Sequence, residues 1–167
     1  MKNIILIGMP SAGKSTVGVI LAKHRGMSFV DTDVLIQSRQ GRLLQEILNS
    51  EGTDAFLKIE ETEIQCLNCS DTVIATGGSV VYSEKAMEHL KKTGIVIYLY
   101  VDMETVNKRL KNLKTRGVVL SPGESLEDIY RKRQPLYEKY ADIIINCSEA
   151  SIDSTVEMIH EKLDSLS

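Results

Sequence analysis

The feature that most constrains this chain is a phosphate-binding loop pattern, Gly-x-x-x-x-Gly-Lys-Ser, in the segment GMPSAGKS at residues 8–15. The apolar run Ile4–Ile7 before it is typical of a buried strand, and the stretch Lys14–Arg25 after it is typical of a helix. Glycines let the backbone wrap closely around phosphate oxygens, and the amides at the start of the helix point at the anion. Strand, loop and helix in this order therefore predict a nucleotide-phosphate site.

Within this loop, Lys14 is expected to contact the outer phosphates and Ser15 to offer its hydroxyl to Mg²⁺. The other loop residues predicted to bind the nucleotide are Gly8, Ser11, Ala12, Gly13 and Thr16. The segment Asn107–Leu110 begins like the guanine-specifying pattern Asn-Lys-x-Asp but lacks its aspartate, so guanine specificity is not expected. The predicted cofactors are ATP and Mg²⁺.

Apolar and amphipathic segments alternate along the rest of the chain, with no linker or repeat between them. Further strands are expected at residues 28–30, 72–75, 95–101 and 142–145, and further helices at 32–67 (interrupted near Gly41 and Gly52), 83–92, 104–113, 126–140 and 151–166. Strands separated by helices imply a parallel sheet that is covered on both faces. The predicted fold is a single α/β domain over residues 1–167, a three-layer sandwich with about five strands.

Composition narrows the partners and the compartment. The net charge of −3 gives no sign of a nucleic-acid or membrane surface, and no apolar stretch is long enough for a signal peptide or a membrane span. Three cysteines without a signal sequence favour reduced thiols in the cytoplasm. The pair Cys66 and Cys69 has no second pair or histidine spaced to complete a zinc site, so packing is expected for both. A small-molecule acceptor and a monomer are the remaining expectations.

Two carboxylates, Asp31 and Asp33, follow the predicted strand at residues 28–30. In a parallel sheet this strand end lies near the phosphate loop, so an acidic pair spaced by two residues can serve two ligands. We assign Asp31 to the Mg²⁺ shell through water, and Asp33 to the acceptor hydroxyl as positioner or general base. The alternative is that one of the two caps the helix that follows.

An ordered set of segments resembles the shikimate kinases over nearly the whole chain. It consists of GMPSAGKST at residues 8–16, FVDTD at 29–33, the spacing of Gly52, Phe56 and Glu60, ATGG at 75–78, the apolar strand IVIYL, Arg116 before a loop, and RQPLY at 133–137 followed by Ala141 and Asp142. The resemblance implies a P-loop kinase fold with a mobile lid at about residues 112–125 and an acceptor-binding helical segment at about 32–60.

The resemblance also implies roles for single residues. Asp33 would hold the acceptor hydroxyls near the γ-phosphate, Gly77 and Gly78 would bring backbone amides to the acceptor, and Arg133 would bind the acceptor carboxylate. On the lid, Arg116 would offer charge to the phosphoryl group in transfer, and lid closure would exclude water.

For Arg109 the resemblance implies packing on adenine, which suits a planar guanidinium. A solvated surface position is the alternative for Arg109, Arg116 and Arg133.

Two positions depart from the family pattern. Shikimate kinases typically carry an arginine directly after the phenylalanine of the Gly-x-x-x-Phe segment, where it clamps the shikimate carboxylate, and this chain has Leu57 there. They also usually have a third glycine after Ala-Thr-Gly-Gly, where this chain has Ser79. Losing one partner of a buried charged pair costs roughly 2–5 kcal/mol. Both residues are therefore predicted to shape the acceptor pocket.

The leading interpretation is ATP-dependent phosphorylation of shikimate to shikimate 3-phosphate. Leu57 leaves open a different hydroxy acid or polyol as acceptor, or a shikimate carboxylate held through Lys58 or a neighbouring residue. Other P-loop kinases, such as gluconate or nucleotide kinases, are further alternatives. A non-catalytic ATP-binding regulator is the alternative of another class, and the retained Lys14, Asp33 and Arg116 argue against it.

Overall fold

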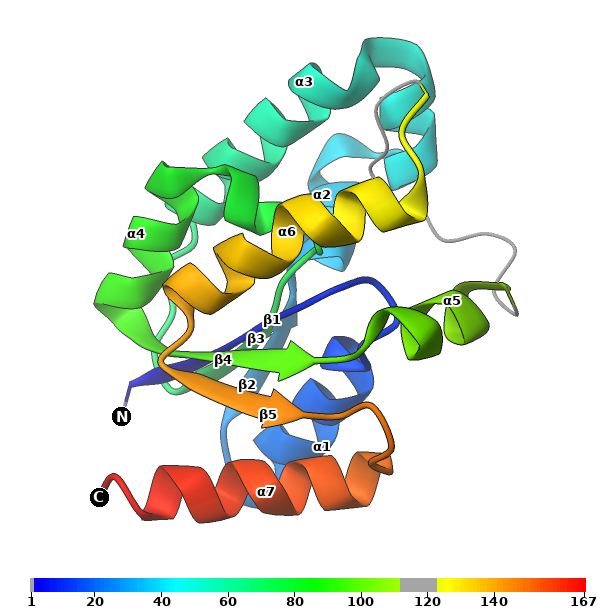
Figure 1. Cartoon of the computed structure of the whole chain (residues 1–167). Coiled ribbons are helices and arrows are strands. Elements are labelled where there is room, and N and C mark those ends of the chain that lie inside the picture. The colour runs from blue at the N-terminus through cyan, green and yellow to red at the C-terminus, as the bar shows by residue number, and fades with distance from the viewer. Residues whose placement is uncertain (1, 112–122) are drawn as a thin grey trace.

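The computed structural model describes residues 2–111 and 123–167 (Figure 1). Its centre is a parallel sheet in the order β2-β3-β1-β4-β5. The strands are β1 (Asn3–Ile7), β2 (Ser28–Asp31), β3 (Thr72–Ala75), β4 (Gly94–Tyr100) and β5 (Ile143–Asn146). The helices are α1 (Lys14–Arg25), α2 (Thr32–Gln40), α3 (Leu44–Gln65), α4 (Glu84–Thr93), α5 (Met103–Lys111), α6 (Leu126–Tyr140) and α7 (Ile152–Asp164), with a short 3-10 helix, η1, at Val80–Tyr82.

Helices cover both faces of the sheet, as Figure 1 shows. α1 and α7 pack together on one face, and α4 and α6 lie on the other. α2 and α3 continue beyond this second layer, at the top of the view. The predicted three-layer α/β fold with about five parallel strands is confirmed. Across residues 2–111 and 123–167, no helix is long and apolar enough to cross a membrane.

The central strand β1 is buried along its whole length, with Ile5, Leu6 and Ile7 fully enclosed. A continuous apolar strand of this kind belongs in a parallel sheet that has helices on both faces. β1 pairs with β4 from Asn3 opposite Gly94 onward. A Cβ at Gly94 would lie 2.1 Å from the Asn3 carbonyl oxygen, so the two backbones meet where only glycine fits. The strand predicted at residues 95–101 therefore begins one residue earlier.

The helical segment predicted at residues 32–67 is two helices, α2 and α3. Gly41 ends α2 in a left-handed conformation, and α3 is kinked at Gly52, where φ is 85° and ψ is 175°. Both interruptions were predicted from the two glycines, and positive φ is the reason that glycine is suited to each position.

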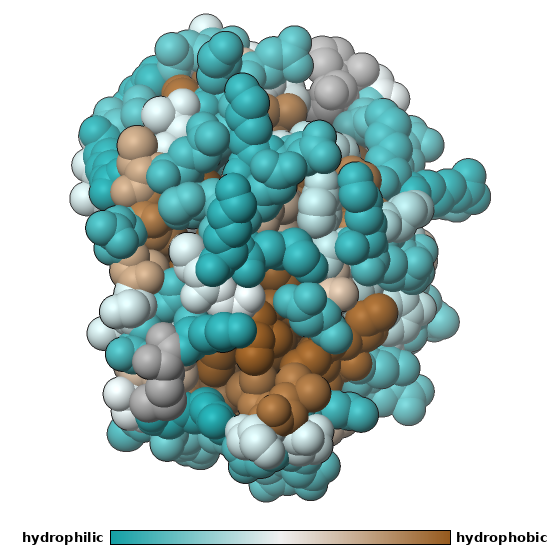
Figure 2. All heavy atoms as spheres, turned by 90° about the vertical axis from the view of Figure 1, so that its left-hand side faces the viewer, coloured by the Kyte–Doolittle hydropathy of each residue, from teal (hydrophilic) through white to brown (hydrophobic). Residues whose placement is uncertain are grey.

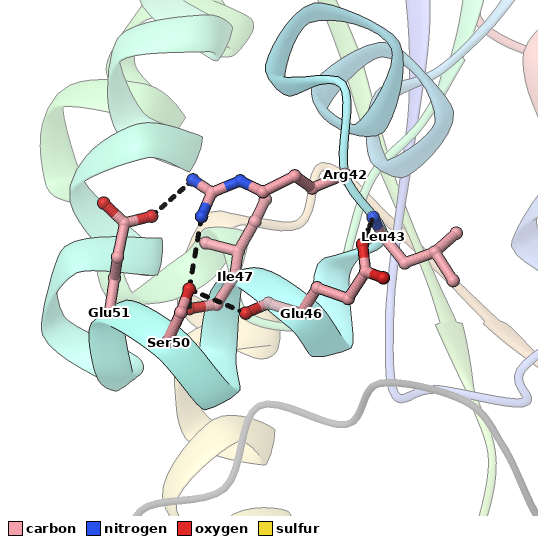
Figure 3. Close-up of polar contacts among 6 residues, drawn as sticks. All are labelled: Arg42, Leu43, Glu46, Ile47, Ser50 and Glu51. Carbon is pink, nitrogen blue, oxygen red and sulfur yellow. Dashed lines mark hydrogen bonds and ion pairs between the residues drawn. The ribbon is translucent and has the colours of Figure 1, made fainter.

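Polar contacts hold the turn between α2 and α3 to the first part of α3 (Figure 3). The Arg42 guanidinium donates to the Ser50 hydroxyl at 3.2 Å and pairs with the Glu51 carboxylate. The Glu46 carboxylate accepts from the Leu43 N–H at 2.8 Å and so satisfies a donor at the start of the helix. These contacts fix the turn that brings Leu43 to the edge of the cavity described below.

The predicted lid lies mostly outside the described residues. Arg116 and residues 112–122 are not described, and neither is the expected end of the helix at 104–113 beyond Lys111. α6 begins at Leu126 as predicted, because the Ser125 hydroxyl accepts from the Asp128 N–H at 3.1 Å and caps the helix.

Figure 2 shows the side of the molecule from which the strands start, which is the left-hand side of Figure 1. Hydrophobic residues gather in the lower half of this face, and hydrophilic residues cover most of the upper half. Ligands of parallel α/β sheets bind beyond the opposite, carboxyl ends of the strands. Those ends lie on the right in Figure 1, where β1 turns into α1.

We expect replacement of Asn3 by alanine to lower the free energy of unfolding by about 1–3 kcal/mol. The Asn3 side chain is buried, donates to the Cys69 carbonyl at 2.8 Å and accepts from the Thr72 N–H at 3.1 Å, so alanine leaves both groups without this partner. Urea denaturation measures the change. Asn68→Ala, at an exposed position nearby, is the control and should stay within about 0.5 kcal/mol of the parent protein; an equal loss in both variants would contradict the prediction.

Candidate active site

A cavity of about 480 Å³ opens at the carboxyl ends of β1, β2 and β3. The phosphate loop lines one part of it, and Asp31 and Asp33 at the end of β2 line another. The segment after β3, residues 76–79, and Arg133 of α6 complete the wall, together with residues of α2 and the start of α3. The structure thus brings together Lys14, Asp31, Asp33 and Arg133, which are far apart in the sequence and were predicted to bind nucleotide, Mg²⁺ or acceptor.

The phosphate loop wraps around the start of α1. The Lys14 side chain is buried and its ammonium donates to the carbonyl oxygens of Gly8 at 2.7 Å and Met9 at 2.8 Å. Ser11 takes a left-handed conformation with φ of 71°, and its buried hydroxyl has no hydrogen-bond partner among the described residues. An inward cation, an unsatisfied hydroxyl and a helix N-terminus together fit a phosphate group.

The loop residues named from the sequence are placed as follows. Ser11, Gly13, Lys14, Ser15 and Thr16 line the cavity. Gly8 and Ala12 lie in the body of the loop rather than in the cavity lining.

Arg109 of α5 reaches the outer side of the same loop. Its guanidinium donates to the Ser11 carbonyl at 3.0 Å and to the Cys147 carbonyl at 3.4 Å. Arg109 is therefore not merely a solvated surface residue, because its side chain is anchored to the phosphate loop.

Asp31 caps a helix and also contacts the phosphate loop. Its Oδ1 accepts from the N–H groups of Asp33 at 3.0 Å and Val34 at 3.2 Å, so it caps α2, as the alternative interpretation predicted. Its Oδ2 accepts from the Ser15 hydroxyl at 2.6 Å. A hydroxyl and a carboxylate side by side at the phosphate loop form the hard oxygen set that suits Mg²⁺.

The side of the cavity predicted to bind the acceptor is built around Gly77. A Cβ on Gly77 would lie 2.6 Å from Asp33 Oδ1 and 2.8 Å from Glu60 Oε2, so the absence of a side chain lets the two carboxylates approach the same small space. The Gly77 N–H donates to the Thr32 hydroxyl at 3.2 Å. This differs from the expectation that the Gly77 amide reaches the acceptor, because Thr32 engages it within the protein.

Arg133 and Gly78 form the other end of the acceptor side. The Arg133 side chain is 1% exposed, and its Nη1 lies 2.9 Å from the place of a Cβ on Gly78. Its Nε donates to the Tyr82 hydroxyl at 3.2 Å, and its guanidinium lies 5.2 Å from the centre of the Tyr82 ring. A buried guanidinium at the cavity wall can bind a carboxylate in the way predicted for Arg133.

Tyr137 supports this end of the cavity and was missed at the sequence level. Its hydroxyl donates to the Gly78 carbonyl at 2.6 Å, and its ring stacks on Tyr98 with the centroids 5.0 Å apart. The signals in the sequence were its place in the segment RQPLY and its position four residues after Arg133, which puts both side chains on one face of α6.

Glu60 is the second residue that sequence reasoning missed as a functional candidate. It is buried, and its Oε1 accepts from the Ser79 hydroxyl at 2.8 Å. The pKa of Glu60 is raised to about 7, chiefly by burial. The nearby Asp33 carboxylate also raises this pKa, whereas the hydrogen bond from Ser79 and the charge of Arg133 lower it. The available signal was its spacing, because Glu60 stands four residues after the core residue Phe56 and so shares its buried face.

Leu57 lies beside the cavity rather than in its lining. It borders a smaller adjoining hollow of about 210 Å³, together with Lys58, Glu60, Tyr82 and Ser79, the last of which lines both spaces. The prediction that Ser79 lines the acceptor cavity therefore agrees with the structure, whereas Leu57 faces the neighbouring hollow.

The sequence and the fold were compared with those of known proteins. A family model described as shikimate kinase matches residues 10–164. A shikimate kinase from Thiobacillus denitrificans is 36% identical over 98% of this chain and 91% of that protein, and one from Pasteurella multocida is 40% identical over 99% and 97%. The structure of shikimate kinase from Acinetobacter baumannii in complex with shikimate superposes with a TM-score of 0.91, at 31% identity over 99% of this chain and 94% of that one.

We expect Lys14→Met to weaken ATP binding about 10- to 100-fold, because a charged hydrogen bond contributes about 1.5–3 kcal/mol. Calorimetric titration with ATP measures the change. Lys23→Met removes an exposed cation from the same helix and should leave ATP affinity unchanged; equal losses in the two variants would mean that general charge, and not the loop lysine, holds the nucleotide.

Proposed function

This chain belongs to the shikimate kinase family, and we propose that it transfers the γ-phosphate of ATP to a hydroxyl of shikimate, giving shikimate 3-phosphate. It is a phosphotransferase that acts on an alcohol group. The observation that carries the proposal is the single cavity in which the phosphate loop, the Asp33 carboxylate and the buried Arg133 guanidinium meet. This set supplies a phosphate site, a hydroxyl-orienting base and a carboxylate-binding cation.

In the proposed mechanism, Asp33 orients the attacking hydroxyl and accepts its proton as the new bond to the γ-phosphorus forms and the bond from that phosphorus to the departing ADP breaks. Arg133 binds the carboxylate of shikimate, which fixes the ring so that the hydroxyl points at the γ-phosphate. Lys14 and the amides at the start of α1 stabilise the negative charge on the phosphoryl oxygens. Each of these groups lines the described cavity.

We further propose that Ser15 and Asp31 hold Mg²⁺, with Asp31 acting through water. The 2.6 Å contact between their oxygens gathers a suitable donor set at the phosphate loop. When bound, the ion would neutralise charge on the outer phosphates of ATP.

Two arginine roles extend this proposal. Arg109 is anchored to the carbonyl of Ser11 in the phosphate loop, which supports packing of its guanidinium against adenine. Arg116 and the lid lie outside the described residues, so their part in covering ATP stays a prediction.

A cytoplasmic, monomeric enzyme is also our proposal. The cytoplasmic location is supported by three free cysteine thiols, Cys66, Cys69 and Cys147, which suit a reducing compartment.

We expect Asp33→Asn to lower the kcat of shikimate-dependent ADP release about 100- to 10,000-fold, because asparagine cannot accept the hydroxyl proton. Coupled measurement of ADP with Mg²⁺-ATP, with and without shikimate, gives the rate. Asp54→Asn, at an exposed position of α3, is the matched control and should behave as the parent enzyme.

Leu57→Arg in the same assay separates the acceptors. Absence of shikimate-dependent turnover in the parent enzyme, with a gain in Leu57→Arg, would contradict the proposal and favour a different hydroxy acid or polyol.

We expect Asp31→Asn to raise the Mg²⁺ concentration for half-maximal turnover about 10- to 100-fold, the usual effect of losing a partner that orients a metal's ligands. Asparagine still caps a helix well, so thermal unfolding should show little loss of stability. A Mg²⁺ requirement that does not change in Asp31→Asn, or in Ser15→Ala, would contradict this assignment.

A further inference from the structure

Glu60 lies at the partition between the acceptor cavity and the adjoining hollow, and its exposed fraction is 2%. Ser79 donates to its Oε1, and its Oε2 has no hydrogen-bond partner within the part of the chain that the structure describes. A buried ionised carboxylate with an unsatisfied oxygen is costly, whereas the protonated acid is much less so. The surroundings of Glu60 therefore favour its neutral form.

The charged and titratable groups that face Glu60 come from α2 and α6, and Tyr82 of η1 borders the same hollow. Asp33 at the start of α2 raises the pKa of Glu60, and Arg133 of α6 lowers it. Tyr137 of α6 is neutral near physiological pH, because burial raises its own pKa. Oδ1 of Asp33 lies 2.6 Å, and Oε2 of Glu60 2.8 Å, from the place where a Cβ on Gly77 would stand. Two carboxylates that border the same small space do not readily both ionise.

Leucine at position 57 removes one way to offset a charge on Glu60. The two residues are three positions apart on α3, beyond the kink at Gly52, so a cation at position 57 would stand one turn away from the carboxylate. Leu57 supplies no charge there. Protonation of Glu60 removes the negative charge that such a cation would have neutralised.

An acceptor carboxylate makes this neutralisation matter for binding. With Glu60 neutral, Asp33 and Arg133 carry opposite charges at this end of the cavity. With Glu60 ionised, an incoming carboxylate would join two negative side chains and one positive side chain within a largely buried site.

We propose that Glu60 is a positioning residue that must hold a proton before the acceptor carboxylate binds, and that the Ser79 hydroxyl fixes its orientation. The proposal rests on the proposed function, because it takes the acceptor to be shikimate, a carboxylic acid. It makes Glu60 and Ser79 determinants of acceptor affinity that act through charge and geometry rather than through the transferred phosphoryl group.

The test is the pH dependence of shikimate binding to the whole protein without ATP, measured by calorimetry at pH 6, 7 and 8. The affinity of the parent protein should fall about tenfold from pH 6 to pH 8, because the neutral fraction of a group titrating near pH 7 falls by this factor. At pH 8, buffers with different ionisation enthalpies should report uptake of about one proton on binding. The described residues that line the cavity include no histidine to produce the same effect.

Glu60→Gln mimics the neutral acid and can still accept from Ser79. Its affinity for shikimate should not change with pH and should exceed that of the parent protein about tenfold at pH 8. Glu61→Gln is the matched control, since Glu61 also accepts from a serine hydroxyl, that of Ser83, but is not among the groups that approach Gly77 at the cavity wall; it should keep the parent pH profile.

Ser79→Ala gives a second, independent readout. Loss of the hydrogen bond that lowers the pKa of Glu60 should move the fall in affinity to higher pH. An affinity in the parent protein that is constant or rises with pH, or a Glu60→Gln variant that binds shikimate more weakly at every pH, would overturn the proposal while leaving the proposed function intact. If shikimate fails to bind at any pH, the proposed function falls, and this proposal falls with it.

Discussion

Parallel pairing is the constraint on which the rest of this structure depends. Because every strand of the sheet runs in the same direction, the ends of β1, β2 and β3 meet at one edge. β1 turns there into the phosphate loop, β2 ends at Asp31, and β3 leads to Gly77 and Gly78. The sheet itself therefore positions the residues of the cavity, since the phosphate loop follows the buried β1 and lies beside the ends of β2 and β3.

The features that could be predicted from the sequence are those encoded in short, continuous segments. The phosphate loop, the alternation of strands and helices, and the breaks at Gly41 and Gly52 are all written in short segments, and the structure agrees with them. The acidic pair was expected beside the phosphate loop, and Asp31 accepts there from Ser15, because β1 and β2 end at the same edge of the sheet. Capping of α2 by Asp31 was foreseen as an alternative, and the cap and the contact with Ser15 use different oxygens of the carboxylate.

Other features depend on contacts between segments that no spacing rule connects. Glu60 stood out in the sequence only through its spacing from Gly52 and Phe56, and its contacts with Asp33, Ser79 and Arg133, which three other segments supply, are visible only in the structure. The Gly77 amide could not be known to bond Thr32 without the relative placement of α2 and the segment after β3. The two departures from the family pattern, Leu57 and Ser79, looked independent along the chain, yet both border the hollow that Glu60 also lines.

That adjoining hollow has a consequence for inhibitors. Ser79 is shared between the two spaces, so the hollow begins where the acceptor cavity ends. A compound that occupies the cavity and extends an apolar arm past Ser79 would bury that arm against Leu57 and Tyr82, at about 25 cal/mol for each Å² removed from water. An enzyme with a cation at position 57 would instead have to desolvate that charge, so the leucine offers a handle for selective inhibition of this chain.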